Sequence, residues 1–192
     1  MKKPLIVNLY GAPSAGKSTG AAYIFSKLKL KRINAELVTE FVKGKVYEQS
    51  KGVFDNQVYI FGKQFFQMSK LYDNVDVIIT DAPLMLQAYY GEKYNFFYSQ
   101  ELTNLVKRVV EEENALNIFV ERSKHYDPSG RFQTEQESDE IAKELRTFLE
   151  DNNIDFTTIC GDTEYYDKVV NEVCNILWRD TQAADEDGLL NR

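Results

Sequence analysis

The segment GAPSAGKST, residues 11–19, decides the fold of this chain. It matches the pattern G-x-x-x-x-G-K-[ST] through Gly11, Gly16, Lys17 and Ser18. The apolar run PLIVNLY precedes it and the helix-forming run GKSTGAAYIFSKLKL overlaps and follows it. This is the strand–turn–helix context in which the pattern forms a phosphate-binding P-loop. The sequence therefore predicts a site for a nucleoside triphosphate.

Each residue type in this segment has a physical role. The glycines permit backbone conformations that turn successive N–H groups toward phosphate oxygens, and the positive end of the following helix points at the same anion. Lys17 is expected to reach the β- and γ-phosphates, and the Ser18 hydroxyl is expected to bind Mg²⁺. The predicted nucleotide-binding residues are Gly11, Ala12, Pro13, Ser14, Ala15, Gly16, Lys17, Ser18 and Thr19.

Strand-like and helix-like runs alternate along the rest of the chain. The runs predict further strands at 35–40, 76–81, 116–121 and 154–159, and helices at 55–72, 99–113, 134–149 and 163–178. A capping box, Thr134 with Glu137, marks the start of one helix. Such alternation predicts an α/β fold, a doubly wound five-stranded parallel sheet, as a single domain over 1–178. The acidic, polar segment 179–192 is predicted to be a disordered tail.

Composition and charge limit the class of function. A chain of 192 residues that is 43% apolar suits one domain with a core. The formal charge of −7 argues against general nucleic-acid binding, although the basic patch 27–32 leaves that partner open. No membrane span or signal peptide is expected, and Cys160 and Cys174 lack metal spacing, so the predicted location is cytoplasmic with no membrane partner. His125 is the only histidine, which argues against a Ser-His-Asp hydrolase.

Two carboxylates end predicted strands, where ligands bind in parallel α/β sheets. Asp81 ends DVIITD in the Walker-B arrangement, which predicts a Mg²⁺ ligand or a group that positions the attacking hydroxyl. The alternative for Asp81 is a turn residue ahead of Pro83. Glu40 ends AELVTE and would either accept a proton from a substrate hydroxyl or be solvated. The N-K-x-D and L-S-G-G-Q motifs are absent from the sequence, which argues against a GTPase switch and a transporter-type ATPase.

The segment RSKHYDPSGRFQ, residues 122–133, carries Arg122, Lys124 and Arg131 around a Pro-Ser-Gly turn. Cations on a loop beside a nucleotide site predict a lid that stabilises charge on the transferring phosphoryl group and excludes water. The alternative is an exposed basic loop. Residues 47–98 hold more than half of the 12 phenylalanines and 12 tyrosines. Most of these are expected in the core, while some could stack on a planar ring of an acceptor.

Several segments together resemble a known family. They are GAPSAGKST, LVTEFVKGKVYE, DNQVYIFGKQ, IITDAPLMLQAYYGEKY, FVERSKHYDPSGRFQ and NNIDFTTI. In order, from residue 4 to about 178, they resemble the ribosylnicotinamide kinase domain of NadR-type bacterial regulators and related small phage-encoded P-loop kinases. The resemblance implies a nucleoside/nucleotide-kinase-like fold, ATP and Mg²⁺ as cofactors, Asp81 near the acceptor hydroxyl, and the Arg122–Arg131 lid over the phosphates. Counterparts of that regulator's adenylyltransferase and DNA-binding portions are not found in this sequence, so the acceptor stays open.

The sequence thus predicts a kinase that moves the γ-phosphoryl group of ATP to a hydroxyl or phosphate of a small nucleoside-like acceptor. The acceptor would be a nucleoside, a nucleoside monophosphate or nicotinamide riboside. The predicted catalytic residues are Lys17, Asp81, Glu40, Arg122 and Arg131, with Ser18 and Asp81 as metal ligands. Two alternatives remain: a kinase acting on a modified base in DNA, and a regulatory P-loop ATPase that binds a protein partner.

Overall fold

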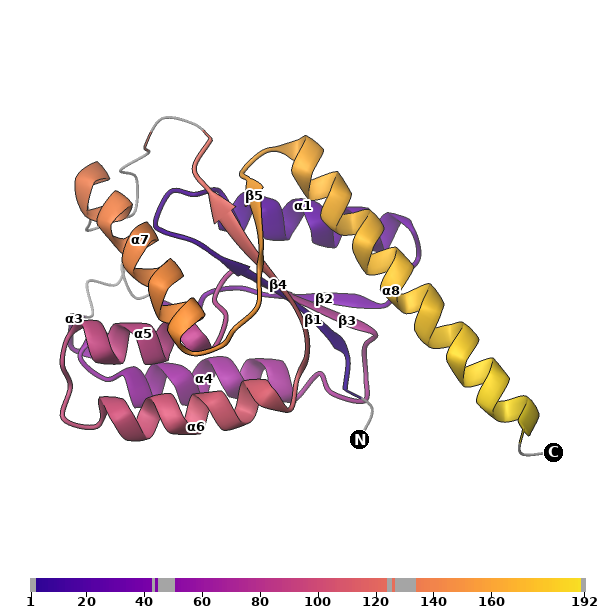
Figure 1. Ribbon diagram of the computed structural model, residues 1–192, viewed down its shortest axis with the longest axis horizontal. Coiled ribbons are helices and arrows are strands. Elements are labelled where there is room, and N and C mark those ends of the chain that lie inside the picture. The colour runs from indigo at the N-terminus through magenta and orange to yellow at the C-terminus, as the bar shows by residue number, and fades with distance from the viewer. Residues whose placement is uncertain (1–2, 43, 45–50, 124–125, 127–133, 191–192) are drawn as a thin grey trace.

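A five-stranded parallel sheet forms the centre of the molecule (Figure 1). The computed structural model describes residues 3–42, 44, 51–123, 126 and 134–190. The strands, in the spatial order β2-β3-β1-β4-β5, are β1 (Leu5–Tyr10), β2 (Ala35–Val38), β3 (Val77–Thr80), β4 (Asn114–Glu121) and β5 (Thr157–Cys160). The helices are α1 (Lys17–Leu30), α3 (Lys51–Phe54), α4 (Gln57–Ser69), α5 (Met85–Lys93), α6 (Ser99–Glu111), α7 (Glu135–Asp151) and α8 (Thr163–Leu190).

Helices cover both faces of this sheet (Figure 1). On one face Ile6 and Tyr10 of β1 pack into a core that includes residues of α4, α5, α6 and α7. On the other face Val7 and Leu9 pack against residues of α1 and α8. All six residues of β1 are buried because it is the central strand, paired with β3 and β4. The predicted doubly wound parallel sheet is confirmed.

The element boundaries follow the sequence pattern with some differences. Every predicted strand and helix is present with shifted ends, and α7 begins with the predicted capping box, in which Thr134 and Glu137 hydrogen-bond reciprocally. Helices α3 and α5 were not predicted. Helix α5 buries Met85, Leu86, Gln87, Ala88, Tyr89 and Gly91. Because most of its residues are buried, it lacks the polar face that makes a helix recognisable from sequence.

Helix α8 differs from the prediction for the C-terminal segment. It continues to Leu190, so the segment 179–192, predicted to be disordered, is helical through that residue and extends beyond the body of the molecule (Figure 1). Val169, Val170 and Val173 anchor the first half of α8 in the core. Propagation of an anchored helix adds one hydrogen bond per residue, which is easier than forming a new helical turn. Among the described residues no helix is both long and apolar enough to cross a membrane.

The turn between α6 and β4 holds a partly buried carboxylate, Glu113. The Tyr72 hydroxyl donates to its Oε1 at 3.4 Å. Burial raises the pKa of Glu113 to about 7, and the Tyr72 hydrogen bond and the Lys3 charge offset only part of this shift. Between its ordinary pKa of 4.5 and this value, the folded state keeps a proton that the unfolded state releases. The free energy of unfolding should therefore fall as the pH rises through this window.

We expect Glu113→Gln to remove this pH dependence. The wild type should lose ~1–2 kcal/mol of stability between about pH 5 and 8, a linkage value reduced for the partial solvent access of the carboxylate. The variant should lose less and be the more stable protein at pH 8. Urea denaturation across this pH range measures the effect, with Glu112→Gln as the matched control, because Glu112 is exposed. An equal change in the free energy of unfolding with pH in the wild type and in Glu113→Gln would contradict the prediction.

Candidate active site

The P-loop connects the end of β1 to the start of α1. Three of its residues have positive φ angles, namely Gly11 at 138°, Ser14 at 66° and Gly16 at 99°. Residues with a Cβ rarely adopt such angles because the Cβ clashes with the backbone. A Cβ on Gly11 would also lie 2.5 Å from the carbonyl oxygen of Val120. Backbone geometry therefore requires both glycines of the motif.

The first turn of α1 fits an anion. Gly16 is the N-cap, so no side-chain oxygen caps the first N–H groups, and the first turn holds no acidic residue. These N–H groups and the positive end of the helix dipole are the groups that bind phosphate oxygens at helix N-termini. The loop and the helix therefore offer the environment that the triphosphate of a nucleotide requires.

The Lys17 side chain lies across the mouth of the loop. Its Nζ donates to the carbonyl oxygens of Gly11, at 2.7 Å, and Ala12, at 2.9 Å. An ammonium group held there is close to the positions that phosphate oxygens occupy in a P-loop. Its predicted role on the β- and γ-phosphates requires only a rotation of the side chain away from the two carbonyls.

A cavity of about 320 Å³ lies beside the P-loop at the carboxyl ends of β2 and β3. It brings together Ser18 from the first turn of α1, Glu40 from the segment after β2, and Asp81 from the end of β3. The remaining lining residues are Ala21, Ala22, Leu37, Thr39 and Gly44. Three of the predicted site residues, which are far apart in the sequence, thus share one cavity.

Hydrogen bonds fix the polypeptide around Asp81 and Glu40. Asp81 is only 3% exposed, and its Oδ1 accepts from the backbone N–H of Glu40 at 2.9 Å. Gln64 of α4, also buried, donates to the Thr80 hydroxyl at 3.3 Å and accepts from the N–H of Phe41 at 3.3 Å. Sequence analysis missed Gln64, although a glutamine on the apolar side of a helix is a usable signal. These contacts hold the segments that carry both carboxylates together at the carboxyl ends of β2 and β3.

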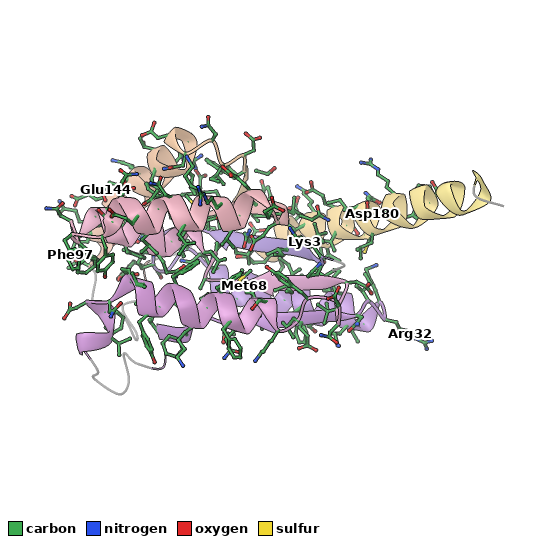
Figure 2. All side chains as sticks on the ribbon, turned by 90° about the horizontal axis from the view of Figure 1, so that it is seen from below. Lys3, Arg32, Met68, Phe97, Glu144 and Asp180 are labelled. Carbon is green, nitrogen blue, oxygen red and sulfur yellow. The ribbon has the colours of Figure 1, made fainter. Side chains whose placement is uncertain are left out.

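Part of the aromatic-rich segment 47–98 lies near Glu40. Burial and the nearby charge of Glu40 raise the pKa of Tyr90 above its ordinary range. The Tyr90 ring stacks on Tyr94 with centroids 6.0 Å apart, and Tyr94 is 52% exposed. Others in the segment are core, such as Phe61, or fully exposed, such as Phe97 at the outer corner between α5 and α6 (Figure 2). Burial in the core is therefore confirmed for some of these rings, whereas the described residues that line the cavity include no aromatic side chain, and stacking on an acceptor stays a prediction.

The predicted lid is only partly described. Arg122 forms an ion pair with Glu135 at 3.4 Å and a hydrogen-bonded pair with Asp139, both on the first turns of α7. Its guanidinium group also lies 5.5 Å from the ring centroid of Tyr126. Lys124 and Arg131 lie outside the described residues. The structure thus holds Arg122 against α7, and a role for it on the phosphates stays a prediction.

The donor set limits how a metal could bind. The described part of the chain contains no cluster of three or more His, Cys, Asp or Glu side chains suited to a metal ion. Mg²⁺ at a nucleotide site usually takes one or two protein ligands, with phosphate oxygens and water completing the octahedron. Ser18 and Asp81, which line the same cavity, fit that pattern.

Comparison with protein families and curated sequences gives one match. The model of the AAA_28 family, described as an AAA domain, matches residues 6–168. A search of curated protein sequences found no match.

Three solved structures with similar folds are informative. A NadR protein in complex with NR has a TM-score of 0.66 and 18% identity, covering 88% of this chain and 50% of that one, so this chain spans about half the length of that NadR chain. Deoxyadenosine kinase from M. mycoides with bound dATP has a TM-score of 0.61 and 19% identity, and the match covers 88% of this chain and 99% of that one. Thymidylate kinase from Ehrlichia chaffeensis has a TM-score of 0.56 and 13% identity, and the match covers 92% of this chain and 99% of that one. At these identities the likeness establishes the fold, which all three share with this chain.

Proposed function

We propose, because the chain belongs to the AAA_28 family of AAA domains and has the fold of P-loop kinases, that it transfers the γ-phosphoryl group of ATP to a nucleoside-like acceptor. The acceptor atom would be a hydroxyl or phosphate oxygen of a nucleoside, a nucleoside monophosphate or nicotinamide riboside. The observation that carries the proposal is the cavity shared by Ser18, Glu40 and Asp81 beside the P-loop. A nucleotide bound in the P-loop would direct its terminal phosphate toward this cavity.

Each of these residues has a distinct task in the proposed reaction. Lys17 and the N–H groups of the loop hold the transferring phosphoryl group and stabilise its charge. Glu40 or Asp81 orients the acceptor hydroxyl and accepts its proton as the new P–O bond forms and the bond from the γ-phosphorus to the bridging oxygen of the leaving ADP breaks. A magnesium ion bound by Ser18 and Asp81 would neutralise phosphate charge. Both carboxylates stand at the cavity wall, where an acceptor would meet the phosphate.

Two aromatic residues near Glu40 would form part of the acceptor side of the proposed site. Tyr90 lies within electrostatic reach of Glu40, and Tyr94 stacks on it with its ring half exposed. A planar base or pyridine ring binds well against such faces. This environment supports an acceptor with a planar heterocycle over a purely aliphatic one.

A phosphoryl-transfer screen tests the proposal. Nucleosides, nucleoside monophosphates and nicotinamide riboside are incubated with the protein, Mg²⁺ and ATP labelled at the γ-phosphate, and labelled products are separated. We expect one acceptor class to be labelled. ATP hydrolysis should be slow without it, because a lid that closes only on both substrates would exclude water. Rapid hydrolysis with no labelled acceptor would reject the kinase and favour a regulatory ATPase.

A further inference from the structure

Four carbonyl groups of the P-loop, those of Gly11, Ala12, Pro13 and Gly16, accept hydrogen bonds from side chains. A loop that turns its N–H groups inward to a phosphate turns carbonyl oxygens outward, and buried carbonyls need hydrogen-bond donors. Lys17 supplies the donor for Gly11 and Ala12 from within the loop. The carbonyls of Pro13 and Gly16 accept from two hydroxyls that lie far away in the sequence, on α7 and α8.

Ser138 is the donor on α7. Its Oγ donates to the carbonyl oxygen of Pro13 at 2.7 Å, across 125 residues of sequence, and the side chain is only 2% exposed. The capping box at Thr134 fixes the first turn of α7, and the N–H of Ser138 bonds to the Thr134 carbonyl. A rigid first turn therefore presents this hydroxyl to the loop.

Tyr166 is the donor on α8. Its hydroxyl donates to the carbonyl oxygen of Gly16 at 3.1 Å, and its ring is 2% exposed. Burial, assisted by the charge of Asp162, raises the pKa of Tyr166 to about 12, so the hydroxyl stays protonated near neutral pH. A Cβ on Gly20 would lie 2.5 Å from this ring, and one on Gly16 would lie 2.8 Å from its oxygen. The two glycines thus leave the space that the tyrosine fills.

We infer that Ser138 and Tyr166 are positioning residues that hold the P-loop in its phosphate-binding conformation before a nucleotide arrives. The inference rests on the proposed function, since it concerns the same triphosphate site. Neither residue lines the cavity of Ser18, Glu40 and Asp81. They act through the backbone, by fixing the outward carbonyls of Pro13 and Gly16 and so the direction of the inward N–H groups.

Loss of either hydroxyl should weaken nucleotide binding. The apparent Kd of a ligand rises in inverse proportion to the fraction of protein in the competent conformation. Each single variant loses one hydrogen bond. The net free energy of a typical hydrogen bond corresponds to a rise in Kd of about 3- to 10-fold. The larger rise is expected for Ser138→Ala, because the Gly16 carbonyl keeps its bond from the N–H of Gly20 in Tyr166→Phe. At saturating ATP, kcat should change little.

Calorimetric titration tests this with two ligands, MgATP and inorganic triphosphate, on the full chain. The variants are Ser138→Ala, Tyr166→Phe and the double variant, each with its melting temperature measured. Tyr23→Phe is the matched control for Tyr166, because the Tyr23 hydroxyl joins the same two helices by donating to Asp167 and has no bond to the P-loop. Thr103→Val removes another buried hydroxyl, which donates to Glu92 far from the loop.

The expected result is a raised Kd for both ligands in the Ser138 and Tyr166 variants, with a raised KM for ATP, and unchanged Kd in both controls at comparable melting temperatures. Equal Kd values in the wild type and in the double variant would overturn the inference and leave the kinase proposal standing. An equal rise of Kd in the controls would also overturn it, because the effect would then come from a general loosening of the fold. A wild type that binds triphosphate but labels no acceptor would reject the proposed kinase and keep the inference, whereas one that binds neither ligand would reject both.

Discussion

Replacing Lys17 by alanine is expected to lower kcat/KM for phosphoryl transfer by about 10²- to 10³-fold, the range measured when a charge-stabilising donor is removed from an active site. The melting temperature should stay near that of the wild type. In the structure, Lys17 contacts the Gly11 and Ala12 carbonyls at the mouth of the loop. Its positive charge serves the phosphates in the proposed reaction, and its removal leaves the core of α1 intact.

Lys27→Ala is the matched control for this substitution. Lys27 lies on the same helix, α1, and is partly exposed. Its ammonium group forms an ion pair with Asp167 of α8 at 3.5 Å. Its loss removes the same charge and the same side chain without touching the P-loop, so kcat/KM should stay within about twofold, since surface pairs of this kind contribute at most ~1 kcal/mol. Transfer by Lys17→Ala within threefold of the wild type would refute a role of this lysine on the phosphates.

Asp81→Asn is expected to reduce kcat by about 10²-fold or more, while the Kd of MgATP changes much less. The substitution keeps the size of the side chain, and the asparagine oxygen can still accept from the N–H of Glu40, as Asp81 does now at 2.9 Å. The fold around the site should therefore persist. What is lost is the negative charge that would bind Mg²⁺ or the acceptor hydroxyl. Steady-state kinetics and nucleotide titration of the same preparation separate the two parameters.

Glu40→Gln, measured beside Asp81→Asn at constant Mg²⁺, is the companion test for the proton acceptor. Both carboxylates line the same cavity, and the residue whose substitution costs more in kcat is the better candidate for the base. Asp76→Asn is the control. Asp76 precedes β3, at the end of the strand opposite to Asp81, so its substitution should leave kcat unchanged. A collapse of the melting temperature in Asp81→Asn, or equal losses in kcat and in ATP affinity, would assign Asp81 the role of a turn residue ahead of Pro83.

Helix α4 illustrates where sequence patterns lose information. Apolar side chains are expected on the buried face of a helix, yet Val58 is 46% exposed and Phe66 is 61% exposed. Its buried face contains Gln57 and Gln64 in their place. Gln64 is buried because Thr80 and the N–H of Phe41 satisfy its amide. Polarity alone does not predict such burial, since the partners come from other elements.

The sequence by itself determined the P-loop, the parallel α/β sheet and the capped start of α7. The sheet was predicted from the alternation of strand-like and helix-like runs. The P-loop and the start of α7 depend on groups a few residues apart: glycines at positive φ, a lysine on the first turn, and the reciprocal bonds of Thr134 and Glu137. Such local requirements act within one turn or one strand, so they leave a fixed spacing in the sequence.

Only the tertiary structure decided which side chains meet. It brought Ser18, Glu40 and Asp81 to one cavity, paired Arg122 with α7, and set Ser138 and Tyr166 against the loop. It also continued α8 through a segment whose composition predicts disorder. Partners separated by more than a hundred residues, as Ser138 and Pro13 are, leave no mark in the spacing of either segment. Their contact follows from how helices pack on the two faces of the sheet, and packing depends on the whole chain.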